Sequence, residues 1–406
     1  MGRNFICYEP EYVENFQCDG TACGALCCRN WGITIDKETY HKYKLIPQRK
    51  LRQKILAAID SESFPGEYRI KMCEKRCPML RSDLRCEIQK KCGEKALSNV
   101  CAQHPRRYVL HGENTLFRVL SVSCPIAREL AFASPEAMNI RKKNIMLDRS
   151  IDLSKVIDSR IPQNIVLSVM MTGVKILQNR NYTFDERLFL LGLYLDKCDE
   201  NISGKVTDDI WQRTADFYLQ DDAQFWKNAL EKVSFKYQQY FEFMFGLMDV
   251  FYEKVMVNSN RRGEIFLSYV NKAFDLEKKK TAREFLNVFS AMYDDYSNYV
   301  LQDKWYVLEN YIVQEFWGEV VPFSAEARGM ESSFIIYLVY YKMMEFLLIS
   351  MAGVKKDGIV VDDILELISM MSYYVTHVEE FESIVLDYIG ADINNPMEMM
   401  QKLLIV

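Results

Sequence analysis

Four cysteines lie within eleven residues near the start of the chain, between Cys18 and Cys28. Glycines and other small residues separate them, so the backbone can turn tightly enough to point several sulfur atoms at one position. A segment of this composition cannot be an ordinary core element, because thiolates that converge in this way are ligands of zinc or of an iron–sulfur cluster. The stretch therefore predicts a metal-binding loop.

The other cysteines favour the same interpretation. Eleven of the twelve lie in the first third of the 406-residue chain, and only Cys198 lies beyond it. No apolar leader is visible at the N-terminus, and the longest apolar run, Phe334 to Val354, carries Lys342 and Glu345 near its centre. A membrane-spanning helix would bury both charges in lipid, so we expect a core helix in a soluble, cytoplasmic protein. Because the cytosol keeps thiols reduced, the cysteines favour metal binding over disulfides.

The eleven N-terminal cysteines are candidate metal ligands, and zinc and iron–sulfur chemistry are both open for them. Structural zinc sites prefer C-x2-C pairs, which do not occur here, whereas the observed spacings suit a [4Fe–4S] cluster at least as well. One such cluster uses four thiolates, so not all eleven can bind one centre, and either two centres exist or some thiols only surround one.

Charge also changes sign along the chain. Residues 1–130 hold 22 Lys and Arg against 15 Asp and Glu, a net charge of +7, which leaves −12 for the remainder. A basic surrounding would offset the charge of a thiolate-bound cluster or receive an acidic partner, while an incidental imbalance of solvated side chains is the plainer alternative. We expect neither nucleic acid nor a membrane as a partner.

The N-terminal part predicts irregular structure with short elements. Residues 1–16 are expected to be a polar and aromatic lead-in. One or two helices are expected over Lys37–Asp60, where apolar residues recur at helical spacing. Tyr68–Met72 predicts a short strand after a turn at Phe64–Gly66, and the stretch around His111–Asn114 predicts a hairpin.

From about residue 131 the pattern is helical almost throughout, with no strand pattern. Capping boxes open helices at Thr183 and Thr281, and apolar residues recur at i, i+3, i+4 and i+7. We therefore predict a mainly α fold, with an irregular cysteine-rich domain with short strands over residues 1–130 and an all-helical domain over residues 131–406.

Few residues other than the cysteines are candidates for a functional site. Glu309 and Asn310 stand in an otherwise apolar helical stretch, which indicates either a satisfied polar network or the lining of a pocket. No Gly-x-Gly occurs, so neither a Rossmann loop nor a P-loop is present, and the C-x3-C-x2-C triplet of radical enzymes is absent too. No catalytic residue is assigned.

Several motifs occur along the chain: Cys18-x4-Cys23-x3-Cys27-Cys28-x2-Trp31, Cys77-Pro78, Cys86-x-Ile88-Gln89, Leu97-Ser98-x2-Cys101, Ser123-Cys124-Pro125, Leu308–Val313 and Pro322-Phe323. Together they resemble the flagellin lysine-N-methylase (FliB) family. The N-terminal part is also similar to the YkgJ-type zinc- or iron-chelating cysteine domain. The spacing and this resemblance together predict eight metal ligands, which are Cys18, Cys23, Cys27, Cys28, Cys77, Cys86, Cys101 and Cys124.

The resemblance implies an S-adenosylmethionine-dependent enzyme that methylates lysine side chains of flagellin, with a cysteine-bound [4Fe–4S] cluster. Glu309 and Asn310 are then candidates for donor binding, and we expect the donor where the two domains meet. The alternative is a non-catalytic zinc or iron chelator whose helical domain docks a partner. Binding of S-adenosylmethionine would separate the two hypotheses.

Overall fold

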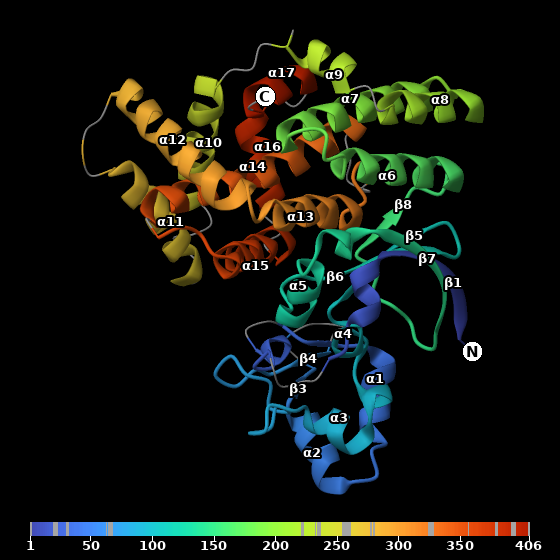
Figure 1. Ribbon diagram of the computed structural model, residues 1–406. Helices are drawn as coiled ribbons and strands as arrows, with labels where there is room; N and C mark the ends of the chain where they lie inside the picture. Colours follow the sequence, from blue (N-terminus) through green and yellow to red (C-terminus); the bar gives the residue numbers. More distant parts are fainter. Residues whose placement is uncertain are drawn as a thin grey trace. The chain divides into compact units, whose positions relative to one another are not determined.

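The chain forms two compact units, each with its own core. The first comprises Met1–Ala131 and Asn139–Ser154, and the second comprises Phe132–Met138 and Lys155–Val406, so the chain passes from one unit to the other three times. The expected boundary at residue 130 lies beside the first of these passages. The computed structural model, shown in Figure 1, describes residues 2–18, 23–29, 32–61, 63, 68–220, 223–231, 233, 237–253, 261–276, 278, 281–323, 329–355, 357–377, 381–390 and 395–404.

The first unit combines short helices with two small groups of strands. The expected hairpin and the expected short strand are both present, as are the two helices after residue 36. The turn expected at Phe64–Gly66 lies outside the described residues. The strands are β1 (Arg3–Pro10), β2 (Thr34–Ile35), β3 (Ile59–Asp60), β4 (Tyr68–Ile70), β5 (Arg106–His111), β6 (Thr115–Leu120) and β7 (Ile140–Leu147). The helices are η1 (Glu11–Asn15), η2 (Leu26–Cys28), α1 (Lys37–Lys44), α2 (Arg49–Ala57), α3 (Glu87–Cys92), η3 (Glu94–Ala96), α4 (Asn99–Gln103) and α5 (Pro125–Ala131).

Two strands of this unit correct the sequence predictions. The lead-in contains β1, which pairs in parallel with β6 and antiparallel with β7. Strand β7 lies in the part expected to be free of strands. Its central residues Arg141, Lys142 and Lys143 mask the alternation that reveals a strand, and charged residues of this kind are typical of sheet edges. Across these strands, the buried carboxylate of Glu9 binds Arg118 and Arg141.

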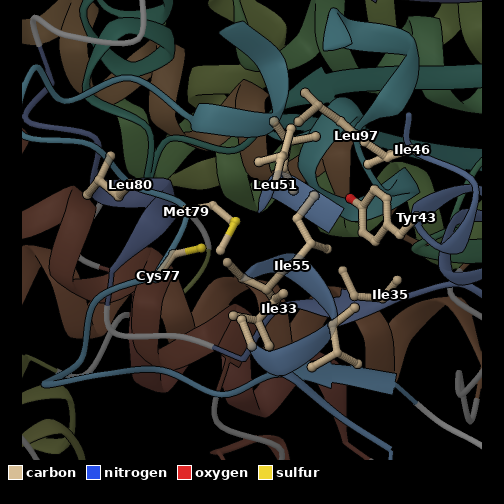
Figure 2. Packing of buried hydrophobic residues seen from close by; sticks show 14 of the residues in the cluster. Ile33, Ile35, Tyr43, Ile46, Leu51, Ile55, Cys77, Met79, Leu80 and Leu97 are labelled. Atoms are coloured by element: carbon tan, nitrogen blue, oxygen red, sulfur yellow. The ribbon is translucent and has the colours of Figure 1, made fainter. Parts of the chain in front are cut away.

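A hydrophobic cluster supports the segments that carry the cysteines. Figure 2 shows side chains of α1 and α2, including Tyr43 and Ile55, packed around Met79 beside the sulfur of Cys77. The chain segments that hold Cys28, Cys86 and Cys101 pack against the same cluster. The cysteine-bearing loops have little regular structure themselves, and their packing against this hydrophobic cluster fixes their positions.

The second unit is helical except for β8 (Lys155–Ile157). Both predicted capping boxes are present, at Thr183 and at Thr281. The helices are η4 (Pro135–Met138), α6 (Gln163–Leu177), α7 (Phe184–Ser203), α8 (Asp208–Leu219), α9 (Ala223–Leu230), α10 (Tyr237–Phe251), α11 (Arg261–Phe274), α12 (Ala282–Tyr296), η6 (Ser297–Leu301), α13 (Trp305–Gly318), α14 (Met330–Val354), α15 (Val361–His377), α16 (Phe381–Ile389) and α17 (Pro396–Leu403).

Helix α14 is the core of this unit. It packs against α7, α11, α12 and α17 (Figure 1). It is long and apolar enough to cross a membrane, yet 89% of its most apolar window is buried inside the protein. The expectation of a core helix is therefore confirmed. The mainly α fold predicted from the sequence is also confirmed.

Candidate functional site

The first cysteine loop is shaped by a left-handed turn. Gly24 and Ala25 adopt φ values of +65° and +55°, and the chain then enters η2, which carries Cys27 and Cys28. The carbonyl oxygen of Cys28 accepts a hydrogen bond from the backbone N–H of Cys77 at 2.9 Å. The first and second cysteine groups are thereby joined through the backbone.

Seven of the eight predicted ligands form a connected set, in which each sulfur interacts electrostatically with at least one other. Cys27 is the centre of the group, since its sulfur interacts with those of Cys28, Cys77, Cys86, Cys101 and Cys124. Cys124 also interacts with Cys23. Cys18 is exposed and lies next to residues 19–22, which are outside the described part of the chain. In the described part of the chain, which includes all twelve cysteines, none of them forms a disulfide.

Backbone N–H groups point at three of these sulfurs. Burial raises the pKa of the Cys77, Cys86 and Cys124 thiols, and two backbone hydrogen bonds to each sulfur oppose this effect. The donors belong to the residues two and three positions further along the chain, so each sulfur lies at the start of a turn. Hydrogen bonds from N–H groups favour the thiolate form, which is the form that binds metal.

A hydrogen bond joins the side chains of Cys27 and Cys28. A hydrogen bond from the Cys28 thiol lowers the pKa of Cys27 to about 7, while the same bond and burial raise the pKa of Cys28. One member of the pair is therefore ready to act as a thiolate near neutral pH.

In the described part of the chain, no three His, Cys, Asp or Glu side chains are close enough to hold one metal ion. A single zinc ion would require its sulfurs to lie about 3.8 Å apart, given tetrahedral Zn–S bonds. A [4Fe–4S] cluster binds each thiolate through a different iron, and hydrogen bonds to the sulfurs tune it. Thiolates are ligands of both, so the identity of the metal stays a prediction.

The four remaining cysteines have other surroundings. Cys7 is buried in β1 beside Glu9, and its burial raises its pKa to about 12. Cys198 is completely buried in α7. Cys73 is exposed, and Cys92 is half-buried with its sulfur 4.0 Å from the side-chain oxygen of Gln48.

Glu309 and Asn310 belong to a buried polar network in α13. The Glu309 carboxylate binds the guanidinium groups of Arg180, at 3.0 Å, and Arg187, at 2.8 Å. The Asn310 amide donates a hydrogen bond of 2.8 Å to the carbonyl oxygen of Ser134. Of the two interpretations that the sequence left open, the contacts favour the satisfied polar network.

A second buried network surrounds Lys342 in the middle of α14. Its ammonium nitrogen lies 2.6 and 2.8 Å from the two carboxylate oxygens of Asp185 and 2.7 Å from Glu345. The hydroxyls of Tyr240 and Tyr296 donate hydrogen bonds to Glu345. Burial raises the pKa of Glu345, and the neighbouring ammonium opposes that rise.

A cavity of about 560 Å³ lies beside both networks, entirely within the second unit. Its volume falls in the range that takes small-molecule ligands. The sequence did not reveal this cavity. Its lining includes Arg180, Phe184, Asp185, Tyr293, Trp305 and Glu345.

The structure thus defines a class of protein in which a thiolate-presenting unit is joined to a helical unit that contains a ligand-sized cavity. Residues 172–403 match the FliB lysine N-methylase C-terminal domain family. The match covers more than half of the chain, and the chain belongs to the FliB lysine N-methylase family. The resemblance of the N-terminal part to the YkgJ-type domain stays a prediction.

Named relatives align over part of their length. Lysine-N-methylases from Salmonella typhimurium (strain LT2) and Salmonella choleraesuis (strain SC-B67) are each 34% identical over 142 residues, which is 34% of this chain and 35% of theirs. The chain thus aligns with about a third of the length of these two relatives. The flagellar biosynthetic protein FliU of Salmonella muenchen is 33% identical over 147 residues, covering 35% of this chain and 86% of that protein. No solved structure matches the chain.

Proposed function

We propose that this protein transfers methyl groups from S-adenosylmethionine to lysine side chains of flagellin in the cytoplasm, and that it depends on a cysteine-bound [4Fe–4S] cluster. The observation that supports this most directly is the family match over residues 172–403, which covers most of the helical unit. The names of the aligned relatives, lysine-N-methylase and flagellar biosynthetic protein, agree with a lysine substrate in the flagellum.

The reaction sets a clear demand on the protein. A lysine amine attacks the donor's methyl group only when neutral, yet its unperturbed pKa is about 10.4. An apolar binding slot would lower that pKa by desolvation, and alignment of the amine with the methyl–sulfur bond would supply much of the remaining acceleration. The nitrogen–methyl bond forms as the methyl–sulfur bond breaks, and the electron pair of that bond stays on the sulfur.

The cluster would be held by cysteines of the first unit. Cys27, Cys77, Cys86 and Cys124 are the strongest candidates, because Cys27 is central to the group and the other three sulfurs accept backbone hydrogen bonds. When bound through these four thiolates, the cluster would supply iron–thiolate bonds that stabilise the fold.

The decisive assay is methyl incorporation into purified flagellin by anaerobically reconstituted full-length protein, using isotope-labelled S-adenosylmethionine. We expect label in lysine residues. A Cys27→Ser variant should lose the label, and circular dichroism recorded in parallel shows whether helix content falls with it, as expected if the cluster is only structural. No incorporation by the fully metallated protein, with flagellin from its own host, would contradict the proposal.

A further inference from the structure

Two groups of charges contribute side chains to the cavity of the helical unit, and each group has an excess of one sign. In the first group, the guanidinium groups of Arg180 and Arg187 line the cavity and share the single carboxylate of Glu309. In the second group, the carboxylates of Asp185 and Glu345 line the cavity and share the single ammonium group of Lys342. The first group therefore sums to one positive charge and the second to one negative charge.

One further carboxylate lies at the cavity. Glu186 accepts a hydrogen bond of 2.6 Å from the backbone N–H of Thr183 at the first turn of α7, where the helix dipole favours a negative charge. With Glu186 included, the charged groups described above sum to −1. The cavity is thus polarised, and as a whole it is complementary to a ligand with a net positive charge.

Aromatic side chains line the same cavity. Phe184, Tyr293 and Trp305 come from the start of α7, from α12 and from the start of α13. The guanidinium of Arg180 lies 4.7 Å from the ring centroid of Trp305, which orients its charge. Aromatic faces attract cationic centres and also stack on flat heterocyclic bases.

We propose that this cavity binds the methyl donor, a small zwitterion that carries an amino-acid group, a sulfonium and a purine ring. Its carboxylate would bind Arg180, its cationic groups would lie toward Asp185 and Glu345, and its base would lie against the aromatic rings. The inference rests on the proposed function and gives the donor a site within the helical unit, instead of the junction between the two domains expected from the sequence. The donor's carboxylate is then held by a guanidinium group and needs no iron.

Other ligands are less complementary to this arrangement. A lysine side chain of a protein substrate has only a cation, so the arginine group would gain no partner. A nucleotide has several negative charges and would meet Asp185, Glu186 and Glu345, and such like-charge contacts weaken binding. The donor combines one carboxylate with an ammonium and a sulfonium, and its net charge of about +1 at neutral pH follows from ordinary pKa values.

The test uses binding of S-adenosylmethionine to the full-length, anaerobically purified protein, measured by equilibrium dialysis. Arg180→Gln removes the charge from a side chain that is 48% exposed, so the fold should tolerate it. We expect this variant to bind the donor at least tenfold more weakly, because a charge-assisted hydrogen bond is lost. Arg180→Lys retains the charge but loses the planar guanidinium that lies against Trp305 and contacts both oxygens of Glu309, so it should weaken binding less than Arg180→Gln without restoring wild-type affinity.

Arg213→Gln is the matched control. Arg213 lies on α8 of the same unit, pairs with Asp209 and is 77% exposed, and it does not line the cavity. Its substitution should leave donor affinity unchanged. A second cavity residue is tested by Trp305→Ala, which should weaken binding at least fivefold because one stacking surface is removed. Thermal unfolding of all four variants separates loss of binding from loss of structure.

The outcomes separate this inference from the proposed function. If the wild type binds the donor and both Arg180→Gln and Trp305→Ala bind it equally well, the cavity is not the donor site, while the proposed function stands. If the wild-type protein neither binds the donor nor labels flagellin, the proposed function fails and this inference fails with it. Selective weakening by the two cavity variants, with the control unaffected, supports the assignment.

Discussion

Replacement of Lys342 by methionine tests how far the helical unit depends on its buried charges. The ammonium group is completely buried and makes three contacts of 2.6 to 2.8 Å with two carboxylates. Methionine has a similar volume but leaves Asp185 and Glu345 buried beside each other without that cation. Breaking a buried ion pair in this way costs about 3–5 kcal/mol, and because Lys342 contacts two carboxylates we expect the free energy of unfolding to fall by about 4 kcal/mol. The midpoint of thermal unfolding should fall by about 10 °C in a domain of this size.

The measurement is urea-induced unfolding followed by far-UV circular dichroism, with Lys197→Met as control. Lys197 pairs with Glu200 on the surface of α7, and its side chain is 49% exposed, so its loss should cost less than about 0.5 kcal/mol. A free energy of unfolding for Lys342→Met within about 1 kcal/mol of the wild type would refute the reasoning.

The loss should also depend on pH in a defined direction. Burial already raises the pKa of Glu345 above its usual value, and removal of the lysine would raise it further. A carboxyl group with a raised pKa in the folded state binds more protons there than in the unfolded chain, so its contribution to stability decreases as the pH rises through that interval. The difference between Lys342→Met and the wild type should therefore shrink as the pH is lowered toward 5. A constant difference across that range would contradict this account.

Two further substitutions have clear expected outcomes. Glu309→Gln removes the carboxylate shared by two arginines, one of them buried, and should lower the free energy of unfolding by about 3 kcal/mol in the same urea assay, whereas a change below about 1 kcal/mol would contradict the buried network. Cys198→Ser replaces a buried thiol far in sequence from the ligand groups and should leave the iron and sulfide content of the purified protein unchanged, so loss of metal would show that Cys198 is not merely structural.

Local patterns were sufficient to predict most of the helical unit. The capping boxes at Thr183 and Thr281 and the helical periodicity of the apolar residues act over a few positions, so they can be read from one sequence. The grouping of the cysteines was predicted for a similar reason, because small residues and paired spacings constrain short loops. Whether those cysteines bind a cluster stays a prediction.

Long-range pairing and the cavity could not be predicted in the same way. Strand β1 finds its parallel partner β6 more than a hundred residues away, and no local signal specifies that pairing. The cavity draws Arg180, Tyr293 and Glu345 from three distant segments. The sequence predicted that Lys342 lies in a core helix, but it did not identify Asp185 as its partner.

The threefold passage of the chain between the two units affects how the protein can be divided. A fragment that begins at residue 172, where the family match starts, would lack Phe132–Met138 and β8, which belong to the helical unit. It would also remove the carbonyl group of Ser134, which accepts the hydrogen bond of Asn310. A cut at residue 131 would instead take Asn139–Ser154 and its strand β7 away from the first unit. Neither unit is one continuous stretch of sequence, so exchanging a whole unit between relatives requires three coordinated splices, one at each passage, and a single crossover would combine segments of both parents within one unit.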